Sequence, residues 1–135
     1  MKQVPANQTT TFKNDKTEMG WKLLENVEIN VTEPIKYIGC LRKNESIISG
    51  QEIIRRAKQV GNAAGQYHAE SLLERQDDIP INMRKYYLLF TGTIWQTEPG
   101  YVVIPYLNCL VDRWFLMFTG LGPDFNKRSR SAHII

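Results

Sequence analysis

The chain has 135 residues, a size typical of one domain that buries a core without disulfides or metal ions. Its 17 basic and 14 acidic side chains leave a formal charge of +3. The basic excess lies near the C-terminus, so the sequence predicts no broad basic face for a polyanion. Two cysteines and an N-terminus without an apolar run favour a cytoplasmic protein with unpaired thiols. Charged residues inside the apolar stretch 101–121 argue against a membrane span.

The N-terminal third predicts an arm followed by two strands. Residues 1–18 are polar and lack an apolar period, which predicts a disordered arm, with a single α+β domain over residues 19–135. Apolar and polar side chains then alternate from Trp21 to Thr32 and, more weakly, from Ile35 to Leu41. Glu33-Pro34 separates the two runs. They are predicted to pair as an N-terminal β-hairpin.

A long or kinked helix is predicted over about residues 50–76. Ser49 and Glu52 have the spacing of a capping box, and one side of the helix is apolar or small. This stripe keeps its phase through Gly61-Asn62, a pair that also commonly ends a helix. One long helix and two nearly coaxial helices are open, as is a break at this pair. A kink or break is favoured, because an unbroken helix would be longer than the strands it covers.

The C-terminal half predicts an antiparallel meander of three to four strands. Its turn and strand signals are Gly92 for a bulge or bend, Glu98-Pro99-Gly100-Tyr101 for a type II turn, Pro105 for an edge strand or bulge, Asn108 to Asp112 for a turn, and Arg130 to Ile135 for a short last strand. The fold class is therefore α+β.

Both faces of this meander are apolar. Tyr86, Leu88 and Phe90 alternate with Tyr87, Leu89 and Trp95, and Trp114, Leu116 and Phe118 alternate with Phe115 and Met117. A single helix covers only one face of a sheet. The sheet is therefore predicted either to curl into a partial barrel that buries the second face, or to hold that face for a partner, a ligand or a second copy of the chain.

The sequence does not state a function, but the aromatic face favours a small non-enzymatic binding or accessory protein. The candidate binding residues are Tyr87, Trp95, Trp114 and Phe115. The predicted partner is a second copy of the chain, in a homodimer, or another protein. No membrane partner is predicted.

Two other classes of protein stay open. In a nucleic-acid-binding module, Tyr87 or Trp95 would stack on bases while cations meet phosphates, the candidates being Arg55, Arg56, Lys58, Lys127, Arg128 and Arg130. Acidic residues in the same helical region, among them Glu52 and Glu70, argue against this class. In a small enzyme, a pocket between helix and sheet would hold His68 or a cysteine.

Motif searches predict no catalytic residue, no metal ligand and no cofactor. His68 has no Cys, Asp or His three or four residues away, so it is interpreted as a histidine packed on the helix stripe. Gly61 and Gly65 lack the Lys-Ser/Thr of a phosphate loop, and helix packing is the interpretation given to both.

Three segments carry a resemblance to other proteins: IKYIGCLRKNESIISGQEIIRRAK, HAESLLERQDDIP and RKYYLLFTGTIW. Over residues 35–118 the chain resembles short uncharacterised bacterial proteins. The resemblance implies a bacterial cytoplasmic protein and brings no known activity with it.

Overall fold

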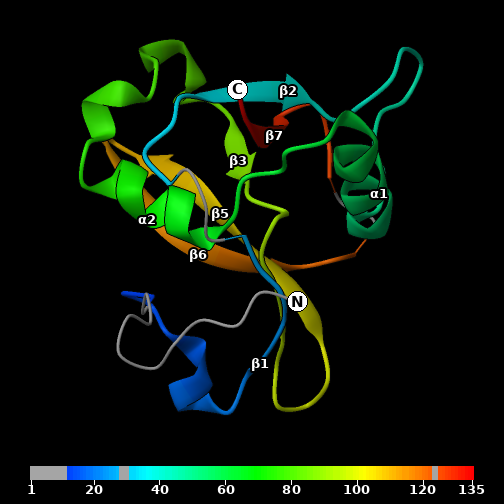
Figure 1. Cartoon of the computed structure of the whole chain (residues 1–135). Helices are drawn as coiled ribbons and strands as arrows, with labels where there is room; N and C mark the ends of the chain where they lie inside the picture. The colour runs from blue at the N-terminus through cyan, green and yellow to red at the C-terminus, as the bar shows by residue number, and fades with distance from the viewer. Residues whose placement is uncertain (1–11, 28–30, 123–124) are drawn as a thin grey trace.

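The structure is a computed structural model that describes residues 12–27, 31–122 and 125–135 (Figure 1). Within these residues two α-helices accompany a mixed, curled sheet of seven strands. The elements are β1 (Lys22–Glu25), β2 (Ile35–Gly39), α1 (Gly50–Val60), α2 (Gln66–Leu73), β3 (Tyr87–Leu89), β4 (Ile94–Gln96), β5 (Val102–Leu110), β6 (Arg113–Gly120) and β7 (Ser129–Ile134), with short 3-10 turns at Lys16–Met19, Gln76–Asp78 and Ile81–Met83. The α+β class is confirmed, and the sheet curls into a half-barrel that has more strands than the predicted meander.

The strands β5 and β6 form a hairpin, and the rest of the sheet is joined to it through β5. Along the other edge of β5, β4 pairs with its beginning and β3 with its middle, both antiparallel. From β4 the sheet continues to β1, and from β3 it continues through a parallel pairing with β7 to β2. The sheet therefore divides beyond β5 into two branches, one of β4 and β1 and the other of β3, β7 and β2. Figure 1 shows β1 below and β2 with β7 above.

The predicted N-terminal hairpin is wrong. β1 pairs with β4, and β2 pairs with β7, each over a long sequence separation. The apolar side chains that suggested the first strand pack on different clusters: Trp21 and Val31 lie beside Trp95, and Val27 lies beside the cluster under α2. Their alternation reflects separate contacts rather than one half-buried strand, and residues 28–30 lie outside the described part.

The predicted helix breaks at Gly61-Asn62, as favoured. α1 ends at Val60, and Gly61 then takes a φ of +90° while its amide donates to the carbonyl of Ala57. α2 begins at Gln66, after Gly65. A β-carbon on Gly65 would lie 2.5 Å from Oγ1 of Thr93, so close packing requires this glycine, whereas Gly61 is required by its backbone conformation.

The two helices are not coaxial, and they cover opposite faces of the sheet. Ile53 of α1 packs with Leu89 and Ile104, whereas Leu72 of α2 packs with Leu88 and Leu107. Neighbouring residues of a strand point to opposite faces. Each face of the sheet therefore has its own helix. The expectation that a single helix covers only one face is wrong, because each face is partly covered.

The linker between the helices fills a gap in the sheet. Where β3 ends, residues 62–64 take its place beside β7: the amide of Ile134 donates to the carbonyl of Asn62 (2.8 Å), and the amide of Ala64 to the carbonyl of Ala132 (2.9 Å). On the linker's other side the amide of Gly92 donates to the carbonyl of Ala64 (2.9 Å). Gly92 is thus the predicted bend, and it separates β3 from β4.

This bend changes which face each aromatic side chain joins. Tyr87 and Leu89 lie on the face of α1, but Trp95, predicted to share their face, lies on the face of α2 beside Tyr67.

Pro105 is not on an edge strand, since β5 has neighbours on both sides. Its carbonyl accepts from the amide of Phe90, so its nitrogen faces the same side, where β3 gives way to β4 and the ladder is already interrupted.

The remaining turns are close to the predicted ones. Gly100 has a φ of +108°, as the predicted turn requires, but the closing hydrogen bond joins the amide of Gly100 to the carbonyl of Thr97, one residue earlier than predicted. The turn between β5 and β6 consists of Val111 and Asp112, inside the predicted range. The last strand is β7.

Part of the predicted arm is packed. Phe12 is buried and stacks on Tyr67, with ring centroids 4.2 Å apart. The amides of Lys13 and Asn14 each donate to the buried carboxylate of Glu70 at 2.9 Å. Residues 12–14 are therefore fixed to α2, and residues 1–11 lie outside the described part.

Close packing at Gly92 gives a test of the linker's position. A β-carbon there would lie 2.7 Å from the carbonyl oxygen of Ala63 and 2.9 Å from the backbone of Ala64, whereas at Gly39 the nearest atom is 3.5 Å away. We expect Gly92→Ala to lower the free energy of unfolding by about 2 kcal/mol and Gly39→Ala to change it by under about 1 kcal/mol. Urea denaturation measures both, and equal effects of the two changes would contradict the packing.

Candidate functional site

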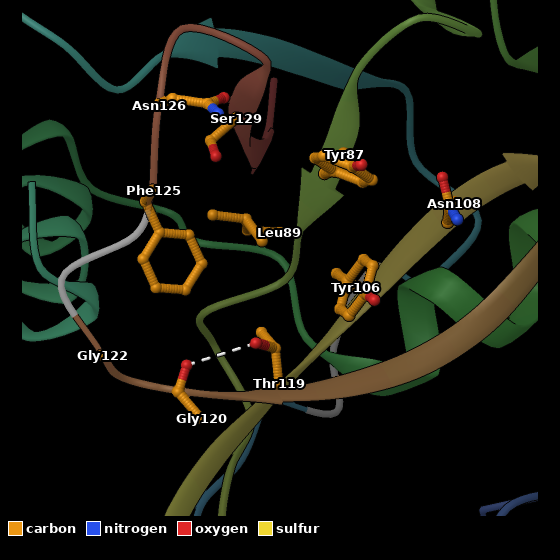
Figure 2. Close-up of a pocket in the computed structure, with 10 residues that line it drawn as sticks. All are labelled: Tyr87, Leu89, Tyr106, Asn108, Thr119, Gly120, Gly122, Phe125, Asn126 and Ser129. Atoms are coloured by element: carbon orange, nitrogen blue, oxygen red, sulfur yellow. Dashed lines mark hydrogen bonds between the residues drawn. The ribbon is translucent and has the colours of Figure 1, made fainter. Parts of the chain in front are cut away.

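A pocket of about 470 Å³ opens on the face of the sheet that α1 partly covers. Its floor belongs to β3, β5 and β6, and its wall to residues 122 and 125–126 between β6 and β7 (Figure 2). The lining residues are Tyr87, Leu89, Tyr106, Asn108, Thr119, Gly120, Gly122, Phe125, Asn126 and Ser129. Leu89 and Phe125 also belong to the apolar cluster of α1, so the pocket begins where the cover given by α1 ends.

Strand register brings the floor residues together. Leu89 pairs with Tyr106 across β3 and β5, and Asn108 pairs with Phe115 across β5 and β6, so these side chains share one face. The rings of Tyr87 and Tyr106 meet edge to face, with centroids 5.9 Å apart. The pocket therefore has a rigid aromatic side, because both rings stand on paired strands.

Among the described residues, the lining carries hydrogen-bonding groups and no Asp, Glu, His, Cys, Lys or Arg side chain. Its polar groups are the amides of Asn108 and Asn126, the hydroxyls of Thr119 and Ser129, and two phenols. Burial, with a smaller effect of Tyr87, raises the pKa of Tyr106 above its ordinary value of 10.0, so this phenol stays neutral. Such a lining can orient a ligand by hydrogen bonds and stacking.

Arg128 and Lys127 lie beside the pocket, whereas Arg130 pairs with Leu88 and so lies on the other face of the sheet. The guanidinium carbon of Arg128 lies 4.9 Å from the ring centroid of Tyr87, and that of Arg130 lies 3.8 Å from the ring centroid of Tyr86. Lys127 is exposed next to Arg128. Over the described ranges, no carboxylate lies within salt-bridge distance of these three basic residues.

The other basic residues predicted to meet phosphates, all on α1, form ion pairs with glutamates. Arg56 forms ion pairs with Glu45 and Glu52, both at 2.7 Å, Arg55 pairs with Glu52 at 2.5 Å, and Lys58 pairs with Glu25 at 3.3 Å. Hydrogen bonds from Arg56, with a smaller effect of the Arg42 amide, hold the pKa of Glu45 at about 2, and those from Arg55 and Arg56 do the same for Glu52. The structure thus splits the nucleic-acid candidates into a paired group on α1 and an unpaired group around the start of β7.

The four aromatic candidates also split. Tyr87 lines the pocket, and Phe115 is 43% exposed on the same face next to it. Trp95 and Trp114 are 0% and 2% exposed on the other face, in the core under α2. No signal in the sequence points to Asn126 and Ser129, since Ser129 reaches the pocket through the parallel pairing of β7 with β3 and Asn126 through the segment that precedes β7. Tyr106 and Asn108 were detectable as partners of the exposed β6 face.

A second cavity, of about 290 Å³, lies between α1 and the strands β2 and β7 and includes Cys40, Ser131 and His133. Burial raises the pKa of the Cys40 thiol to about 11, so it is protonated at neutral pH. Nδ1 of His133 is 2.8 Å from the carbonyl oxygen of Gly61, which can only accept, so Nδ1 carries the proton. Nε2 then accepts from the hydroxyl of Ser131 at 2.8 Å. His133 thereby ties β7 to the end of α1.

His68 has a structural contact as well. It is fully buried, and its Nδ1 accepts from the amide of Gly65 at 3.0 Å, which caps the start of α2. Across the described residues, no group of three or more His, Cys, Asp or Glu side chains is arranged to hold a metal ion.

Comparison with known proteins finds no family model, curated protein or solved structure that matches the chain. In the part of the chain that the structure describes, no helix has the length and apolar character to cross a bilayer. Function is therefore argued from the pocket and the charges beside it.

The hydrogen bonds of the buried His133 to Gly61 and Ser131 predict that the stability of the protein depends on pH. Burial, reinforced by Lys36 and opposed by the hydrogen bond to Gly61, lowers the pKa of His133 below its ordinary value of 6.5. The unfolded chain therefore binds more protons than the folded chain once the pH falls below 6.5, and stability declines there. We expect the melting temperature to fall between pH 7.5 and 5.5, and to fall less in His133→Gln, as measured by thermal denaturation. Equal pH slopes in the two proteins would contradict a neutral, buried His133.

Proposed function

We propose that the protein is a small non-enzymatic binding protein whose ligand site is the pocket formed by β3, β5, β6 and the segment that follows β6. The observation that carries this proposal is the chemistry of the lining, which combines aromatic rings with amides and hydroxyls and, among the described residues, includes no carboxylate, histidine, lysine or cysteine. A ligand held there is bound and oriented without being transformed.

The size and arrangement of the pocket support a small, flat ligand. Its volume of about 470 Å³ falls within the range of roughly 300–1,000 Å³ that is usual for small-molecule sites. In Figure 2 the ring of Tyr87 lies between the amide of Asn126 at the upper left and that of Asn108 at the right, with Leu89 and Phe125 below Asn126. A ring system with polar groups on its edge would match this distribution, because its faces meet the rings and its edge meets the amides.

A protein partner on the same face is the second candidate. Phe115 and Met117 are 43% and 39% exposed beside the pocket, and within the described residues β6 pairs only with β5. An apolar edge strand of this kind is open to another strand, including β6 of a second copy. Native mass spectrometry of the purified chain separates the candidates, because a dimer and a bound small molecule differ in mass.

The pocket proposal is tested by amide NMR of the whole chain with two neutral probes, benzamide and adenosine. We expect saturable shifts of the side-chain amides of Asn108 and Asn126, because both line the pocket. Thr119→Trp fills the pocket from β6 and is expected to abolish these shifts, whereas Thr32→Trp, at an exposed threonine elsewhere, should leave them.

Two results would contradict the proposal. One is the absence of saturable shifts with either probe. The other is a Thr119→Trp protein that is folded, as judged by its backbone amide spectrum, and binds as well as Thr32→Trp.

A further inference from the structure

We infer that the ligand of this pocket is a nucleotide, free or as a unit of a single strand, with its base in the pocket and its phosphate on Arg128. This assignment rests on the proposed function, because it names the ligand class of the same site. It is carried by the juxtaposition of an aromatic pocket with a cation at its edge, where, within the described residues, the pocket lining is uncharged and the cation has no anionic partner.

Arg128 is fixed at the edge of the pocket by two pocket residues. Its guanidinium lies over the ring of Tyr87, and its backbone amide donates to Oδ1 of Asn126 at 2.9 Å. Its Nε donates to the carbonyl of Lys85 at 3.1 Å, which orients the plane of the guanidinium. Within the described residues its two terminal nitrogens have no hydrogen-bond acceptor. A guanidinium held in this way can give both terminal N–H groups to a phosphate.

Among the described residues, three other basic side chains belong to or contact the segment that holds Arg128. They are Lys85, Lys127 and Arg130, and within the described residues neither they nor Arg128 form an ion pair, in contrast to the paired cations of α1. Nη1 of Arg130 donates to the carbonyls of Lys127 and Ser129, so this side chain is held in place as well. The local field therefore attracts an anion to one side of a neutral pocket.

A nucleotide is the anion that uses all these features. A free phosphate would use the cations and leave the aromatic pocket empty, and an acyl chain would leave the amides of Asn108 and Asn126 unpaired. A nucleobase presents a flat surface to Tyr106 or Phe125 and offers edge donors and acceptors to the two amides, while its phosphate reaches the cations.

The test compares the dissociation constants of uridine and uridine 5′-monophosphate for the whole chain by NMR titration at low salt. We expect the nucleotide to bind at least about tenfold more tightly, because the phosphate adds charge-assisted hydrogen bonds to the guanidinium. Arg128→Gln should remove most of this preference. Arg55→Gln is the matched control on α1, where the guanidinium is already paired with Glu52, and it should leave the preference intact.

A short oligothymidylate distinguishes the two sources of the nucleotide. Binding much tighter than that of the mononucleotide, and weakened by added salt, assigns a single strand as the ligand, whereas equal affinities assign the free nucleotide. Equal binding of uridine and its monophosphate by the unchanged protein would overturn the inference and leave the pocket as a site for neutral ligands. Shifts with benzamide but with no nucleoside or nucleotide would also overturn it, and an absence of all shifts would remove the proposed function as well.

Discussion

The stretch from Asn62 to Ala64 lies between β7 and the bend at Gly92, and its position determines much of the fold. Its backbone accepts from Ile134, donates to Ala132 and accepts from Gly92, and Asn62 takes a left-handed φ of 57°. A helix cannot supply these bonds to two neighbours, because its own ladder uses the same groups. The helical region is therefore divided, and α1 and α2 are placed on opposite faces of the sheet.

The pocket follows from this division. Because α1 ends at Val60, it covers one part of its face, around Leu89 and Ile104, and the segment after β6 covers the next part through Phe125. The floor beyond them, with Tyr87, Tyr106 and Asn108, has no helix over it. The same segment leads into β7 and brings Arg128 to Tyr87. The fold thus creates the cavity and the charge beside it with one piece of chain.

Local signals in the sequence predict the ends of elements. Ser49 caps α1 by accepting from the amide of Glu52 at 3.1 Å, Gly61-Asn62 ends it, and Gly100 takes the left-handed conformation that the predicted turn needs. Each of these features depends on a few neighbouring residues and on their intrinsic backbone preferences. They can be read from the chain without knowledge of its long-range contacts.

Strand pairing and the site could be predicted only in part, because they depend on contacts between distant residues. Nothing near Leu23 shows that it will pair with Trp95, and nothing near Tyr87 shows that its strand will lie beside Ser129. The bend at Gly92 changes the face of Trp95, so a simple alternation assigns Tyr87 and Leu89 to the correct face and Trp95 to the wrong one. Of the binding candidates, Tyr87 and Phe115 lie at or beside the pocket, and the two tryptophans belong to the core.

Hydrogen exchange at the amides of Ala64, Gly92 and Ile134 tests most directly whether the linker is an integral part of the sheet. If it is, these amides open only when the whole protein unfolds, and their protection equals that of the most protected amides in β5 and β6. Exchange at Ala64 and Gly92 many times faster than in the β5–β6 hairpin would show that the linker opens by itself. That result would contradict its role in holding the two helices and the pocket in place.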